Sequence, residues 1–191
     1  MKIQPPLSLD SITVHPLTPE RWDDLETLFG ARGACAGCWC MWWRIPRTQF
    51  VAQQGEGNRT ALKALCAGPT PPGLIAYVDG VPVGWVSVGP RESYPALERS
   101  KSLPRLDDQP VWSIVCFFSD KKQRGRGLLA ALIQAALDYA AAHGARIVEA
   151  YPLEDNSMRQ KPVSLYRGLD TTFKAAGFVE AGRPGGEHLI L

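Results

Sequence analysis

The clearest pattern in the sequence is an apolar run followed by a polar turn and an amphipathic segment, all between residues 111 and 143. Residues 111–118 are almost wholly apolar, as expected of a buried strand. After the turn, apolar residues recur at i, i+3, i+4 and i+7, which predicts a helix that ends before Gly144. The apolar stripe of this helix consists of Leu129, Leu132, Ile133, Ala136, Leu137 and Ala140.

Shorter patterns predict the remaining elements of one α/β domain. Alternating or short apolar runs predict strands over residues 12–16, 74–78, 83–88, 146–151, 178–181 and 188–191. Helical spacing predicts further helices from the N-cap Thr18 to Gly30, from the N-cap Asn58 to Gly68, and over residues 171–176. Asp79 and Gly80 form a hairpin signal between two of the strands. Residues 91–109 have no steady period and predict a long connection.

The composition is that of an ordinary globular domain. The chain has 191 residues, 45% of them hydrophobic, and a formal net charge of +2, which suits a single domain with a sizeable core. We expect a leader over residues 1–11 and the domain over residues 12–191. The small net charge argues against a nucleic-acid partner, and the lack of ~18 consecutive apolar residues argues against a membrane span. Without a secretory signal, we expect a cytoplasmic location and reduced thiols. Nothing in the sequence determines the oligomeric state.

The turn before the predicted central helix has the chemistry of an anion site. A strand that enters a helix through a glycine-rich turn leaves several backbone N–H groups unpaired at the positive end of the helix dipole. Residues 124–127, Arg-Gly-Arg-Gly, form this turn, and Lys121 and Lys122 add positive charge. Several mobile cations suit a di- or polyphosphate better than a lone carboxylate. The sequence therefore predicts a phosphate-binding turn at the start of this helix.

Two motifs of the chain resemble those of the GCN5-related N-acetyltransferases (GNAT). Residues 124–129, Arg-Gly-Arg-Gly-Leu-Leu, are similar to the R/Q-x-x-G-x-G/A turn of that family, although Leu129 stands where the last small residue belongs. Residues 173–178, Phe-Lys-Ala-Ala-Gly-Phe, resemble the C-terminal Y-x-x-x-G-F signature. The resemblance covers residues 12–191. It implies a single α/β (α+β) domain whose mixed, mostly antiparallel central sheet is flanked by helices.

The resemblance also implies an activity, which is direct transfer of the acetyl group of acetyl-CoA to an amine, without a metal. In the family, the amides of the turn hold the pyrophosphate, and a backbone N–H of the central strand polarises the thioester carbonyl. Carried over position by position, the residues that bind the cosubstrate are Cys116, Phe117, Phe118, Ser119, Arg124, Gly125, Arg126, Gly127, Leu128 and Leu129.

Other interpretations of the turn stay open. Gly125, Gly127 and Ala130 also fit the dinucleotide pattern G-x-G-x-x-G/A, and Glu149 follows at about the ~20 residues expected for a ribose contact. The polar segment between the strand and the first glycine weighs against this pattern. A purely structural turn with solvated arginines is a further alternative. A domain that binds acyl-CoA as a sensor, without turnover, is the alternative from another functional class.

Proton transfer needs groups that the family pattern does not supply here. The tyrosine that opens the C-terminal signature is the usual general acid of the family, and Phe173 in its place cannot donate a proton. Tyr166 is the first candidate donor. Further candidates near the predicted site are Cys116, Ser119 and Tyr151. Glu92 and Glu149 are candidate bases for an amine that must be neutral to attack, and a structural or solvated role is the alternative for each.

Residues 34–44, Ala-Cys-Ala-Gly-Cys-Trp-Cys-Met-Trp-Trp-Arg, are the most unusual segment. Its three cysteines are Cys35, Cys38 and Cys40, and a closed zinc site would need a fourth ligand. Packed reduced thiols are the favoured interpretation, and a metal site, a redox pair and a catalytic thiol stay as alternatives. Its three tryptophans, Trp39, Trp42 and Trp43, offer rigid apolar faces. We expect them to bind the acceptor, which predicts a small, partly apolar amine.

Overall fold

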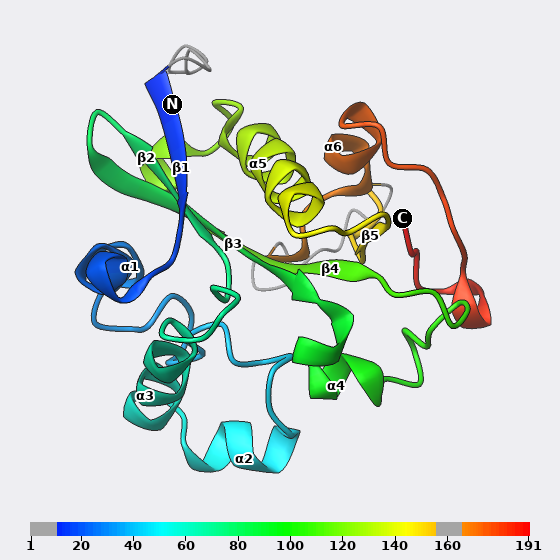
Figure 1. Cartoon of the computed structure of the whole chain (residues 1–191), viewed down its shortest axis with the longest axis horizontal. Coiled ribbons are helices and arrows are strands. Elements are labelled where there is room, and N and C mark those ends of the chain that lie inside the picture. Colours follow the sequence, from blue (N-terminus) through cyan, green and yellow to red (C-terminus); the bar gives the residue numbers. More distant parts are fainter. Residues whose placement is uncertain (1–10, 156–165) are drawn as a thin grey trace.

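A five-stranded sheet forms the centre of the computed structural model, which describes residues 11–155 and 166–191 (Figure 1). The strand order is β1-β2-β3-β4-β5, and every neighbouring pair is antiparallel except β4 and β5. The strands are β1 (Ile12–Pro16), β2 (Leu74–Val78), β3 (Val81–Pro90), β4 (Trp112–Ser119) and β5 (Val148–Ala150). The predicted mixed, mostly antiparallel sheet is confirmed. All but one residue of the predicted leader lie outside the described residues.

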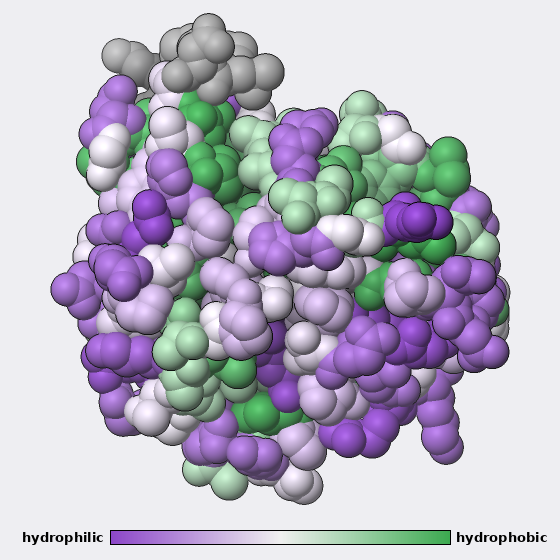
Figure 2. Space-filling view, viewed as in Figure 1, coloured by the Kyte–Doolittle hydropathy of each residue, from purple (hydrophilic) through white to green (hydrophobic). Residues whose placement is uncertain are grey.

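Helices cover both faces of the sheet. α5 (Leu128–Ala142) and α6 (Asp170–Ala175) lie on one face, and α1 (Trp22–Phe29) and α3 (Glu56–Leu65) lie on the other (Figure 1). The alternation of β2 explains this division, because Leu74 and Ala76 pack into the α5 side while Ile75 and Tyr77 pack into the α1 side. Figure 2 shows that hydrophilic residues cover most of the viewed face. Buried hydrophobic residues form clusters on both sides of the sheet.

The predicted central helix is confirmed as α5, with Gly144 just past its end at φ +82°. Five residues of α5 are buried, namely Leu128, Leu132, Ile133, Ala136 and Ala140. A Cβ atom on Gly84 of β3 would stand 3.1 Å from side-chain atoms of both Leu128 and Leu132. Glycine at this position therefore lets the N-terminal end of α5 approach the sheet closely.

Three details of the prediction are wrong. Asn58 does not cap α3, because that helix begins at Glu56 and Asn58 lies inside it, where its amide donates to the carbonyl of Gly37 at 3.1 Å. Two strands were predicted at the C-terminus, but the described residues there form an isolated bridge between Gly182 and Ile190 instead. The connection after β3 contains short helical turns, and the only α-helix described in it is α4 (Pro95–Glu98).

The short helix α2 (Arg47–Ala52) was not predicted, because six residues carry too little periodicity to identify a helix. No helix in the described part of the chain is long and apolar enough to cross a membrane.

Candidate active site

The glycine turn opens directly into α5. Gly125 and Gly127 adopt φ values of +72° and +88°, which glycine reaches at little cost. Gly127 is the N-cap, and no side chain of the described residues caps the helix. The first N–H groups of an α-helix have no acceptor inside the helix. The backbone of residues 128–130 therefore offers donors at the positive end of the helix dipole.

The space beside this turn is open. A Cβ atom added to Gly125 or Gly127 would meet nothing within 4 Å among the described residues. Arg124 is exposed, and Arg126 donates from Nη1 to Oε1 of Gln123 at 2.6 Å. Leu129 is partly buried against the core, and its Cδ2 would lie 3.7 Å from a Cβ on Gly168. Leu129 thus packs into the protein instead of crowding the turn.

The second half of β4 forms an unpaired edge. β4 pairs with β5 only over Trp112, Ser113 and Ile114. Beyond them, residues 115–119 have no strand partner on the β5 side within the described residues. The chain after β5 turns away and forms a bridge between Leu153 and Leu169 instead. Residues 116–119, predicted to bind the cosubstrate, therefore form a strand edge that is free within residues 11–155 and 166–191 and leads to the glycine turn.

A β-bulge sits where this free edge begins. The pairing of β3 with β4 skips one residue between Ile114 and Cys116. Because of the extra residue, Val115 and Cys116 both lie on the side opposite α5, while Ile114 and Phe117 lie on the α5 side. The bulge thereby aims Cys116 at the segment between α1 and α2.

Tyr166 lies near this bulge. Its phenol is half-buried, and burial raises its pKa to about 12, with Arg167 lowering it and the charges of Cys116 and Cys40 raising it further. The phenol therefore lies within electrostatic range of both thiols. Tyr166 keeps its proton at neutral pH and has an O–H to donate.

Phe173, which stands at the position of the family tyrosine, belongs to the core. It has no exposed surface, and its ring lies 5.9 Å from that of Phe117 and 5.1 Å from that of Phe178. No helix joins it to Tyr166, because Gly168 adopts φ +76° between them and α6 begins only at Asp170. The two residues are therefore in different environments, and only Tyr166 is near the bulge thiols.

Glu149 is held in a buried network around Arg91, a residue that the sequence did not single out. Arg91 has no exposed surface; its Nη1 lies 2.9 Å from Oε2 of Glu149 and its Nε lies 2.7 Å from Oε1 of Glu98. The hydroxyl of Tyr151 also donates to Oε2 of Glu149, at 2.7 Å. As a single charged residue in a long connection, Arg91 belongs to no sequence pattern from which its burial could be predicted. Glu149 therefore joins β5 to the segment after β3, with two donors on one carboxylate oxygen.

Glu92 lies at the other end of the sheet. Its side chain is 60% exposed and pairs with Arg105 at 2.6 Å. Burial raises its pKa, but its own backbone amide and Arg105 together outweigh this effect and hold the pKa below its ordinary value. Glu92 shares a small hollow with Trp112 and His143, at the C-terminal end of α5. Since α5 spans 15 residues, or about 22 Å, Glu92 cannot reach a group bound at Gly127.

The three tryptophans of the 34–44 segment point to three different places. Trp39 is 7% exposed and stacks on Trp22 with ring centroids 5.9 Å apart. Trp42 is 39% exposed, and the guanidinium of Arg47 lies 4.1 Å from its ring centroid. Trp43 is partly buried against a cluster that also receives Cys116. Only Trp39 and Trp43 therefore lie beside candidate sites.

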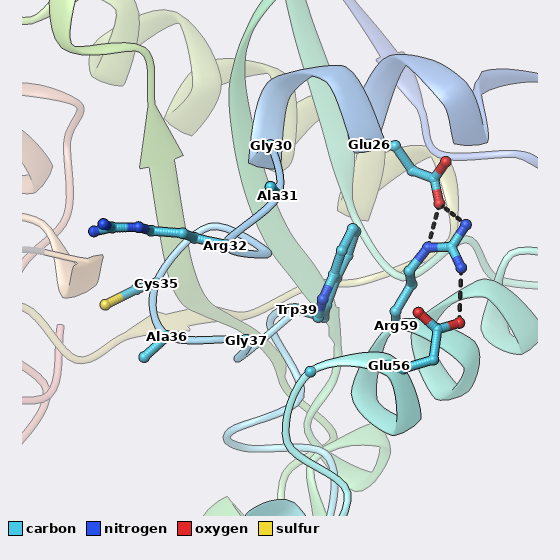
Figure 3. Close-up of a pocket in the computed structure, with 11 residues that line it drawn as sticks. Glu26, Gly30, Ala31, Arg32, Cys35, Ala36, Gly37, Trp39, Glu56 and Arg59 are labelled. Atoms are coloured by element: carbon cyan, nitrogen blue, oxygen red, sulfur yellow. Dashed lines mark hydrogen bonds and ion pairs between the residues drawn. The ribbon is translucent and has the colours of Figure 1, made fainter.

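The same segment borders a hollow of about 860 Å³ that lies against α1 and α3. Figure 3 shows Trp39 near its centre, with Arg59 paired to both Glu26 and Glu56 on one side. Arg32 projects on the opposite side (Figure 3). This volume suits a small molecule, and the walls combine apolar surface with equal numbers of carboxylates and guanidinium groups.

The backbone of this segment is unusual. Four of its residues other than glycine have left-handed φ values, namely Ala34, Ala36, Trp39 and Cys40 at +67°, +49°, +42° and +48°. Each such residue costs on the order of 1–3 kcal/mol, and strain of this kind gathers at functional sites. Among the described residues, no group of histidine, cysteine and acidic side chains is arranged to hold a metal ion.

A sequence model described as the acetyltransferase (GNAT) family matches residues 39–163 of the chain. A search of curated protein sequences gives no match.

Solved acetyltransferases share the fold. A GNAT family acetyltransferase from Streptococcus agalactiae is 18% identical, with 96% of this chain and 95% of that chain covered and a TM-score of 0.55. The aminoglycoside N-acetyltransferase AAC(6')-Iy, in complex with CoA, is 18% identical over 90% of each chain, with a TM-score of 0.52. AAC(6')-Ih from Acinetobacter baumannii, an aminoglycoside 6'-N-acetyltransferase, is 16% identical over 90% and 93% of the two chains, with a TM-score of 0.50. At these identities the likeness shows the fold alone.

Proposed function

The chain belongs to the acetyltransferase (GNAT) family, and from this premise we propose that it transfers the acetyl group of acetyl-CoA directly to an amine of a small, partly apolar acceptor. The observation that carries the proposal is the continuity between the glycine turn and the free edge of β4. The turn offers amides to a pyrophosphate, and the strand edge offers amides and carbonyls to an extended chain that carries amide groups. Acetyl-CoA contains both parts in this order.

The turn would hold the phosphates mainly through backbone amides. The open space beside Gly125 and Gly127 leaves room for the phosphates, and the exposed Arg124 adds a charge that salt screens. The pantetheine part would follow residues 116–119 of β4 and bring the thioester to the bulge. A backbone N–H of these residues would then stabilise the charge that develops on the carbonyl oxygen.

Tyr166 would act on the leaving thiolate. With a pKa raised to about 12, its phenol stays protonated and donates a hydrogen bond to the sulfur as the C–S bond breaks. The amine attacks the carbonyl carbon, loses one proton to water as the amide forms, and solvent returns a proton to the CoA sulfur. We assign proton uptake to water, because Glu149 is held by two donors and Glu92 lies beside the C-terminal end of α5, a helix about 22 Å long that begins at the turn.

The acceptor would bind against residues 34–44. The hollow beside Trp39 has the size for a small molecule, and its balanced charges favour an amine with an apolar body over a polycation, which would need an excess of carboxylates. Trp43 would complete the acceptor side near Cys116. A cytoplasmic location stays a prediction from the sequence.

A thiol-release assay with acetyl-CoA and a panel of amines tests the proposal. We expect CoA release that depends on the amine, and the acetylated product by mass spectrometry. The panel should include aryl-alkyl amines, amino acids, polyamines and aminoglycosides, and the first class is expected to give the highest kcat/KM. Tight binding of acetyl-CoA without turnover of any amine would refute transfer and favour a sensor.

A further inference from the structure

Two cysteines that are distant in the sequence meet at the β4 bulge. Sγ of Cys40 lies 3.0 Å from Sγ of Cys116, although the two residues are 76 positions apart in the chain. Neither the C-x-x-C spacing nor any other local pattern predicts this contact. A disulfide has an S–S length of about 2.05 Å, so a small side-chain movement is enough to form the bond.

We propose that Cys40 and Cys116 form a reversible disulfide that locks the 34–44 segment onto β4 and closes the acetyl-transfer site. A hydroperoxide is the oxidant. The Cys116 thiolate attacks the peroxide O–O bond, so that a sulfenic acid forms and water or an alcohol leaves. The Cys40 sulfur then attacks the sulfenic sulfur, the S–S bond forms and a second water leaves. Overall, the two thiols lose two hydrogen atoms, that is, two protons and two electrons, to the peroxide, and a thiol reductant reverses the reaction.

The surroundings give the two thiols different roles. Cys116 is partly exposed at the free edge of β4, and Cys40 is 4% exposed. Cys116 therefore meets an oxidant first, and Cys40 resolves it. The indole N–H of Trp85 donates to Sγ of Cys40 at 2.9 Å, which holds this sulfur in place. The left-handed backbone of Cys40, at φ +48°, is part of the strained stretch that aims its side chain at β4.

Cys116 is a protonated thiol at neutral pH. The hydrogen bond from Cys40 and burial raise the pKa of Cys116 well above its ordinary value, while the nearby Arg44 lowers it. A protonated thiol reacts slowly, so oxidation of Cys116 needs a sustained exposure to peroxide. The raised pKa of Cys116 therefore slows oxidation of the reduced protein during a brief exposure to peroxide.

The other cysteines are less suited to the reaction. Cys35 is exposed, and Cys38 donates to the carbonyl of Gly33 at 3.6 Å. Burial raises the pKa of Cys38 to about 11. Cys66 is buried and donates to the carbonyl of Leu62 at 3.4 Å. Within the described structure, none of these three thiols forms a hydrogen bond to another sulfur.

The closing effect follows from the position of Cys116 and rests on the proposed function. Cys116 lies at the bulge, where the thioester carbonyl would bind, and the segment that carries Cys40 would contact the acceptor. A covalent bond between them removes the movement that lets both substrates enter. Acetyl transfer by the oxidised protein should fall at least about tenfold, since small displacements of reacting groups have effects of this size.

The test uses the full chain, treated with hydrogen peroxide, blocked with an alkylating reagent under denaturing conditions and mapped by mass spectrometry. We expect a peptide pair joined through Cys40 and Cys116 that has lost two hydrogens, and its disappearance after dithiothreitol. Cys35→Ser should keep the link. Cys40→Ser should abolish it and carry Cys116 on to the sulfinic acid.

Two results would overturn the inference. One is alkylation of both Cys40 and Cys116 after peroxide treatment, and the other is a link between Cys35 and Cys38 in their place. A complete Cys40–Cys116 link with unchanged acetyl transfer would overturn the closing effect. Mass spectrometry detects the Cys40–Cys116 link whether or not the chain acetylates any of the amines tested. The disulfide and the proposed acetyl transfer can therefore fail independently.

Discussion

Replacing Gly127 by alanine should weaken acetyl-CoA binding through the backbone of the turn. Gly127 is the N-cap of α5 at φ +88°, and its Cβ position faces open space among the described residues. An alanine disfavours this left-handed φ, and the backbone relieves the strain by rotating the amides that follow. The new methyl group also projects into the space where the phosphates would lie. Both effects act at the same place.

The expected size follows from the hydrogen bonds. A bond from a backbone N–H to a charged phosphate oxygen contributes about 1.5–3 kcal/mol, and tenfold in Kd corresponds to about 1.4 kcal/mol. Loss of one such bond therefore raises the Kd for acetyl-CoA by at least about tenfold. The strain itself costs on the order of 1–2 kcal/mol of folding free energy. For a chain of this length, that lowers Tm by roughly 2–8 °C.

Gly144 provides a matched control at the other end of the same helix. It has φ +82°, and its Cβ position is equally open among the described residues. Gly144→Ala should lower Tm by a similar amount and leave acetyl-CoA binding unchanged. Isothermal titration calorimetry gives Kd, and thermal denaturation gives Tm. The reasoning is refuted if both variants bind like the parent, or if both lose affinity equally, because the second result would trace the loss to stability.

Three further changes test other parts of the site. Tyr166→Phe should lower kcat about tenfold, or about 1.4 kcal/mol, with the Kd for acetyl-CoA unchanged; an unchanged kcat would exclude the phenol as donor. Since burial raises the Tyr166 pKa to about 12, kcat should not lose this donor until the pH rises toward that value. Arg91→Met removes the cation beside the buried carboxylate of Glu149 and should lower the free energy of unfolding in urea by about 3–5 kcal/mol. Arg105→Met changes a partly exposed arginine and should lower it by at most about 1 kcal/mol. Equal losses would contradict the burial argument. Trp43→Ala should raise the KM for the acceptor by about tenfold. Trp42→Ala should leave this KM unchanged, because Trp42 packs against Arg47. A larger effect of Trp42→Ala than of Trp43→Ala would place the acceptor at Trp42 instead.

The Arg91 network illustrates why part of the site could not be predicted. Its partners come from two separate segments, with Glu98 and Leu103 in the connection after β3 and Glu149 on β5. Each charged residue alone fits a solvated surface position. Arg91 is buried because these segments pack together, and no local periodicity in the sequence predicts that packing. Glu149 was identified as a candidate base, but its carboxylate is engaged by Arg91 and Tyr151.

By itself, the sequence determined the features that depend on neighbours along the chain. The apolar period of α5, the hairpin at Asp79 and the left-handed glycines of the turn are local, because helix period, turn type and φ depend on a few consecutive residues. The candidate cosubstrate site is built from these features, which is why the residues assigned to it lie together.

Only the tertiary structure decided which distant side chains meet. It joined Cys40 to Cys116, placed Tyr166 near both thiols, buried Phe173 and separated Glu92 from the turn. The extra residue in the β4 bulge changes which side chains face the 34–44 segment, and the end of β5 leaves an open strand edge. Both depend on strand pairing between segments far apart in the chain, where a shift of one residue exchanges the two faces of a strand.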